Sequence, residues 1–176
     1  MTAAAAWART RPLGSIFALA LAGVVLVRYG FTAAGAIAAF TTGVLVVLSL
    51  IDTESHRLPN RIVLPAAALV LVARLVSAPD HWAAWLGAAL GVTAFLFAFA
   101  LAFPGGLGMG DVKLALLLGA ALGGAVVSAL LLGTLAGAAA GVVLLARHGR
   151  QARRRAIPFG PFLAFGTIAT LLVLAP

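Results

Sequence analysis

Long apolar runs separated by short polar breaks make up the chain from residue 13 onward. The breaks are the polar segment 52–61, the turn 77–80, the glycine-rich segment 104–110 and the arginine-rich segment 147–155. The runs between them approach the ~20 apolar residues that an α-helix needs to cross the hydrocarbon core of a bilayer. The pattern therefore predicts an all-α fold, a polytopic bundle of transmembrane helices that forms one integral membrane domain over residues 1–176.

The number of crossings depends on residues 112–146, which are too many for one straight span and few for two. Basic residues in loops favour the cytoplasmic side of a membrane. Counted from a cytoplasmic N-terminus, the arginines at 147–155 reach that side only if residues 112–146 cross twice, with a tight reversal that their glycines permit. We therefore predict seven spans, with six as the alternative, at about residues 13–28, 31–51, 62–77, 82–103, 112–127, 129–146 and 157–175.

The first of these runs has a competing interpretation as a cleaved signal peptide, because basic residues precede it. It shows no convincing cleavage site, and a second long apolar run follows it at once. We interpret it as the first membrane helix.

Composition agrees with a lipid environment and excludes several kinds of chemistry. Hydrophobic residues make up 64% of the 176 positions and charged residues 9%, whereas a soluble domain carries about 25% charged residues. The formal net charge of +8 comes from residues that flank apolar runs and set topology, so we expect contact with membrane lipids and no nucleic-acid partner. The chain has no cysteine and its three histidines are widely spaced, so we expect no disulfide, no metal site and no other cofactor.

Two of the four acidic residues lie at the edges of apolar runs. Asp52 directly follows the run 31–51, and Asp111 directly precedes the run that begins one residue later. Ionisable residues at membrane depth are costly and mark functional sites. Each also has a structural interpretation, Asp111 as a helix N-cap and Asp52 as a side chain that reaches the interface from a helix end. The other two acids, Glu54 and Asp80, lie in polar segments, where we expect them to be solvated.

The seven-span topology brings Asp52 and Asp111 to the same, cytoplasmic, side of the membrane. Two close carboxyl groups in a poorly hydrated site share a proton, so that one activates water while the other polarises a peptide carbonyl. Gly108 and Gly110 precede the second aspartate, and residues without a Cβ let an extended substrate approach the backbone. This combination predicts hydrolysis of a peptide bond. The alternative is a small transporter or channel that uses membrane carboxylates for cations or protons.

Three segments of the chain resemble segments of the type IV prepilin leader peptidases, a family of Gly-x-Gly-Asp membrane aspartic peptidases. They are, in the family's order, IDTESHRLPNRIVLP at 51–65, GMGDVKLALLLGA at 108–120 and AIPFGPFLAFG at 156–166. The resemblance implies an endopeptidase of the bacterial cytoplasmic membrane, which cleaves the short basic leader of type IV prepilin or pseudopilin precursors at the cytoplasmic face. Intramembrane peptidases of the presenilin type share only the Gly-x-Gly-Asp segment.

The same resemblance implies roles for individual residues. Asp52 and Asp111 match the family's catalytic aspartates, and the supporting motif positions are Gly108, Gly110, Lys113, Pro59, Pro158 and Gly160. Lys113 lies two residues beyond Asp111 and so falls on another helix face, from which we expect a structural or charge-tuning part. The segment from Pro158 to Pro161 has two interpretations, as the start of the last helix and as part of the active-site lining.

The chain departs from many family members in two respects. Those members carry an N-terminal insert with zinc-binding cysteines and also methylate the new N-terminus of the product, whereas this chain resembles a short, peptidase-only form. Methyltransferase activity therefore stays open. Asn60 stands where many relatives have aspartate, a loop position that leaves the pair of aspartates untouched.

Overall fold

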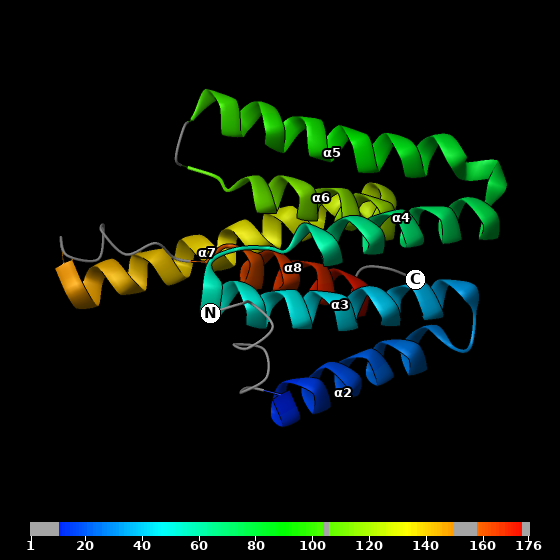
Figure 1. Cartoon of the computed structure of the whole chain (residues 1–176), viewed down its shortest axis with the longest axis horizontal. Coiled ribbons are helices and arrows are strands. Elements are labelled where there is room, and N and C mark those ends of the chain that lie inside the picture. Colours follow the sequence, from blue (N-terminus) through cyan, green and yellow to red (C-terminus); the bar gives the residue numbers. More distant parts are fainter. Residues whose placement is uncertain (1–10, 104–105, 150–157, 174–176) are drawn as a thin grey trace.

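A computed structural model describes residues 11–103, 106–149 and 158–173. Within these ranges the chain is an all-α bundle without strands, which confirms the predicted fold class (Figure 1). The helices are α2 (Arg11–Tyr29), α3 (Ala33–Ser55), α4 (Asn60–Ser77), η1 (Pro79–His81), α5 (Trp82–Ala102), α6 (Met109–Leu122), η2 (Gly123–Ala125), α7 (Val126–His148) and α8 (Gly160–Val173), where η marks a short 3₁₀ helix.

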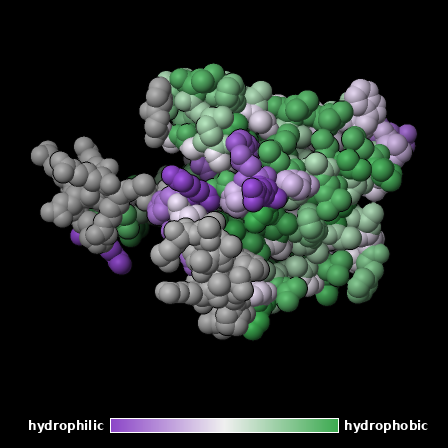
Figure 2. Space-filling view, viewed as in Figure 1, coloured by the Kyte–Doolittle hydropathy of each residue, from purple (hydrophilic) through white to green (hydrophobic). Residues whose placement is uncertain are grey.

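The helices have the length and surface of membrane spans. Four helical stretches are long and apolar enough to cross a bilayer, and two shorter apolar helices accompany them; the stretches are Ala33–Ser55, Asn60–Ser77, Pro79–Ala102 and Met109–Arg147, and the shorter helices are Gly14–Tyr29 and Gly160–Val173. Figure 2 shows hydrophobic residues over most of the visible face, a hydrophilic group left of the centre, near the end where α3 gives way to α4, and a smaller hydrophilic group at the upper right. Large apolar side chains such as Phe95 and Leu131 are at least 60% exposed, as a lipid-facing surface requires.

Contacts between distant residues fix the direction of each helix. The amide of Gly160, at the start of α8, bonds to Asp52 near the end of α3, while the Tyr29 hydroxyl bonds to the Leu171 carbonyl at the opposite end. The helices α3 and α8 are therefore antiparallel. We call the end of the bundle where α3 ends and α4, α6 and α8 begin the site end, and the other end the far end.

The chain reverses between α6 and α7 at a position earlier than the sequence pattern predicts. The turn is η2, where Gly123 has a positive φ of 56° and lies so close to Trp85 that a Cβ would come within 2.7 Å of its ring. From there α7 runs back toward the site end, because Gly137 lies against Phe159 (Figure 1). As a result α6 has only 14 residues and α7 has 23.

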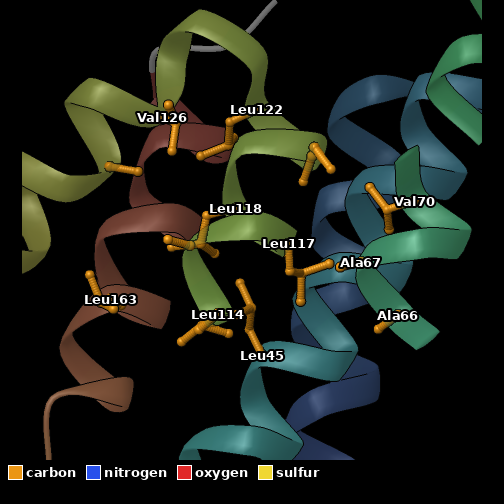
Figure 3. Close-up of a cluster of buried hydrophobic side chains, with 14 of the residues drawn as sticks. Leu45, Ala66, Ala67, Val70, Leu114, Leu117, Leu118, Leu122, Val126 and Leu163 are labelled. Atoms are coloured by element: carbon orange, nitrogen blue, oxygen red, sulfur yellow. The ribbon is translucent and has the colours of Figure 1, made fainter. Parts of the chain in front are cut away.

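The short helix α6 forms the centre of the bundle. Its Leu114, Leu117 and Leu118 are at most 1% exposed, and in Figure 3 their side chains lie among labelled residues of its neighbours, namely Leu45, Ala66, Ala67, Val70 and Leu163. Because lipid is as apolar as leucine, such helices associate through close van der Waals packing rather than through exclusion of water. The packing of α6 therefore determines where Asp111, in its first turn, is held.

Buried hydroxyls of the bundle are satisfied within their own helices, whereas Arg74 Nε and Trp85 Nε1 are buried without a hydrogen-bond partner among the described residues. Four fully buried threonines donate hydrogen bonds of 2.8 Å to carbonyls four residues earlier; they are Thr41, Thr42, Thr167 and Thr170. Arg74 lies 4.4 Å over the ring of Trp85 and donates a 2.7 Å hydrogen bond to the carbonyl of Ala121, near the end of α6. A cation at this position satisfies a carbonyl of the last turn and favours the negative end of the helix dipole.

Replacing Gly119 by alanine tests the contact between α5 and α6. The added Cβ would lie 2.6 Å from Ala89 Cα and 2.7 Å from the Ala88 carbonyl oxygen, so the two backbones must separate. We expect the free energy of unfolding to fall by about 1–3 kcal/mol, measured by thermal unfolding in detergent. Gly43→Ala is the matched control, because a Cβ there meets nothing within 4 Å. An unchanged transition for G119A would contradict this packing.

Candidate active site

Asp52 lies inside α3 and not in the loop after it. The sequence pattern predicted that the span ends at residue 51, but α3 continues to Ser55, and the amide of His56 closes the last turn on the Asp52 carbonyl at 2.8 Å. His56 has a left-handed φ of 51° and ends the helix. Asp52 is only 6% exposed, so it is not a side chain that reaches the interface to be solvated.

The start of α8 holds the Asp52 carboxylate. The Gly160 amide donates a 3.0 Å hydrogen bond to Asp52 Oδ2, and a Cβ on Gly160 would lie 2.7 Å from the same oxygen. The amides at a helix N-terminus favour a negative charge. Within the segment from Pro158 to Pro161, Gly160 begins the last helix and also contacts a candidate catalytic group.

Asp111 lies in the first turn of α6. The N-cap of this helix is Gly108, whose carbonyl accepts the Asp111 amide at 3.0 Å, so the alternative interpretation of Asp111 as the N-cap is wrong. The Asp111 side chain is 9% exposed, and its Oδ2 lies 3.2 Å from the place that a Cβ on Gly108 would take. The missing side chain at Gly108 thus gives this carboxylate its room.

The two carboxyl groups share one cavity at the site end. The cavity has a volume of about 310 Å³, and the two aspartates are close enough to interact electrostatically. It is lined by Asp52, His56, Arg57, Leu58, Asn60, Gly108, Met109, Gly110, Asp111 and Lys113. Residues from the end of α3, the following loop and the start of α6 therefore meet around a pair of buried acids, as the topology predicted.

The supporting motif residues occupy defined places around this cavity. Pro59 is the N-cap of α4, and its carbonyl accepts the amides of Ile62 and Val63 at 3.0 and 3.1 Å. Lys113 lines the cavity together with Asp111 although it leaves the helix on another face, because its long side chain reaches Asn60 Oδ1 at 3.0 Å. Pro158 is half-buried just before α8. Sequence reasoning did not assign Asn60 to the site.

A second, larger cavity contains none of the acids. It has a volume of about 870 Å³, runs between α5 and α7, and is lined almost entirely by apolar residues, with Leu107 and Phe159 among them. The two other acidic residues, Glu54 and Asp80, are exposed. In the part of the chain that the structure describes, no group of three His, Cys, Asp or Glu side chains is placed to hold a metal ion.

The contact between Gly160 and Asp52 can be tested without any activity assay. Gly160→Ala is expected to lower the free energy of unfolding by about 1–3 kcal/mol, because the added methyl overlaps the carboxylate. In an Asp52→Ala background the same substitution should lower the free energy of unfolding clearly less. The difference between the two backgrounds is the coupling energy of a double-mutant cycle, which we expect to be about 0.5–3 kcal/mol. Equal costs in the two backgrounds, measured by thermal unfolding in detergent, would show that the contact is absent.

Comparison with known proteins gives the chain its family. The model of the type IV leader peptidase family matches residues 39–145, which include both buried aspartates. Relatives named "Prepilin leader peptidase/N-methyltransferase" are 33% identical over 150 residues in Bacillus subtilis, 38% over 169 in Pseudomonas putida and 37% over 178 in Pseudomonas aeruginosa. These alignments cover 83%, 91% and 95% of this chain but only 59%, 58% and 60% of the relatives. No solved structure gives a significant match. The chain belongs to the type IV leader peptidase family.

Proposed function

We propose that the chain is an aspartic endopeptidase that cleaves the short basic leader from type IV prepilin or pseudopilin precursors. The observation that carries the proposal is the cavity at the site end, where α3 and α6 supply two buried carboxyl groups to one space. The family match includes both of them. It favours a peptidase over the alternative of a small transporter or channel.

The pair of carboxyl groups supplies the chemistry of peptide hydrolysis. In a poorly hydrated site two neighbouring acids share one proton and titrate as a pair. The ionised member takes a proton from water as the water oxygen attacks the scissile carbonyl carbon, while the protonated member donates to the carbonyl oxygen. When the carbon–nitrogen bond breaks, the amine leaves with the proton that was taken from water, and the other carboxyl group recovers its proton from a hydroxyl of the tetrahedral intermediate.

The position of the cavity fits a substrate that is apolar on one side of the scissile bond and basic on the other. It lies where apolar helices give way to a polar loop, so the apolar segment of a precursor would lie in the bilayer and its leader outside. Gly108 lines the cavity and is exposed, so an extended peptide can approach its backbone.

Charge favours a cytoplasmic location for the site end in a bacterial cytoplasmic membrane. Among the described residues, Arg57, Arg61 and Arg147 are exposed toward the site end, whereas the far end carries exposed Arg28 and Asp80. An excess of arginine and lysine marks cytoplasmic loops. Arg9 and the remaining arginines of the segment 147–155 lie outside the described residues.

Asp52→Asn and Asp111→Asn should each abolish cleavage of a co-expressed prepilin while the protein still inserts into the membrane. Loss of a general acid or base costs about 10²–10⁴-fold in rate, and wild-type cleavage should fall at both low and high pH because one member must be ionised and the other protonated. The leader is followed by its shift on a gel. Glu54→Gln is the matched control, an exposed acid two residues from Asp52, and should cleave normally. Full activity of either Asn variant would end the proposal.

Reporter fusions test the orientation. A reporter that works only in the cytoplasm should be active when it is fused after Arg155. A reporter that works only outside the cytoplasm should be active when it is fused after Asp80. The two positions should lie on opposite sides because an odd number of helices separates them. Reporters at both positions that respond alike would contradict the alternating topology. The opposite pattern would place the cavity at the outer face.

A further inference from the structure

We propose that the segment Leu58 to Asn60 is a clamp that positions Asp111 against Asp52, with Leu58 and Asn60 as positioning residues. The inference rests on the proposed function, because it explains how the two acids are kept together. In this proposal Asp52 and Asp111 carry out the reaction, and the segment from Leu58 to Asn60 holds them in position.

The clamp contacts α6 on both sides of Asp111. On one side, the Leu58 side chain covers Gly110, where a Cβ would lie 3.1 Å from Leu58 Cβ and 3.3 Å from its Cδ1. On the other side, Lys113 Nζ donates a 3.0 Å hydrogen bond to Asn60 Oδ1. The four residues therefore bracket Asp111 with one apolar and one polar contact, and all four line its cavity.

The loop that carries the clamp is itself fixed to Asp52. It leaves α3 through the left-handed turn at His56, whose amide bonds to the Asp52 carbonyl at 2.8 Å. Pro59 holds φ at −71° as the N-cap of α4, and its carbonyl accepts two amides of the first turn. A proline at this place leaves the chain little freedom. The path from one acid to the other thus runs through a short loop with few free torsions.

The clamp also gives a second reason for glycine at position 110. A side chain there would push Leu58 away from α6, since contacts of 3.1–3.4 Å leave no room for a further methyl. Gly108 makes room for the Asp111 carboxylate and Gly110 makes room for the clamp, so each glycine of the Gly-x-Gly-Asp segment serves a different neighbour.

Kinetics of prepilin cleavage test the clamp. Leu58→Ala and Asn60→Ala should each lower kcat about 10- to 100-fold, the scale of a misplacement of about 1 Å, while KM stays within about twofold because the substrate's apolar segment binds elsewhere. Asn60→Asp keeps the acceptor for Lys113 and should restore most of the rate. Arg61→Ala, a neighbour that does not line the cavity, is the control and should match the wild type. Unchanged kcat in both alanine variants would overturn the clamp.

A labelling experiment separates failure of the clamp from failure of the proposed function. The chain has no cysteine, so Asp111→Cys introduces a single thiol at a position that is 9% exposed. We expect a water-soluble maleimide to label Cys at position 111 at least about fivefold faster when Leu58→Ala or Asn60→Ala is added, and no faster with Arg61→Ala, since exposure controls thiol reactivity. Equal labelling rates in all variants would overturn the clamp. If the wild type cleaves no prepilin but labelling rises, the proposed function fails and the clamp stands.

Discussion

The hydrogen bond from the Gly160 amide to Asp52 connects α8, the last described helix, to α3. It joins residues 108 positions apart, and it forms only because Gly160 has no Cβ. The carboxylate so held faces the start of α6, and the loop after it leads directly into α4. The bond thus fixes the end of α3 against the start of α8, beside the cavity that the start of α6 and the loop before α4 also line. An ionisable group in lipid costs several kcal/mol unless it is hydrogen-bonded. The stability of the fold and the position of the candidate catalytic group therefore both require the bond to Asp52.

Glycine solves two different problems in this chain. In the middle of the bundle Gly119, Gly133 and Gly166 lie against the backbones of neighbouring helices, where small residues replace the hydrophobic driving force that lipid does not supply. At the site end Gly108, Gly110 and Gly160 make room for side chains, two carboxylates and one leucine. The sequence alone does not distinguish these two sets of glycines, because only their contacts in the folded structure differ.

Hydropathy predicted where helices exist better than where they end. The helix α3 extends one turn past the apolar run and ends only where His56 adopts a left-handed conformation. The reversal at Gly123 was equally hidden, since several glycines in that stretch could turn the chain. The meeting of Asp52 and Asp111 followed from counting crossings. The partnership of Gly160 with Asp52 did not, because no local pattern encodes a contact over such a distance.

The shortness of α6 limits how far this helix can reach across a membrane. Fourteen residues make a helix of about 21 Å, whereas the hydrocarbon core is about 30 Å thick. Taken alone, α6 is therefore about a third shorter than the core is thick. A bilayer around this bundle must therefore thin locally, or water must reach one end of α6.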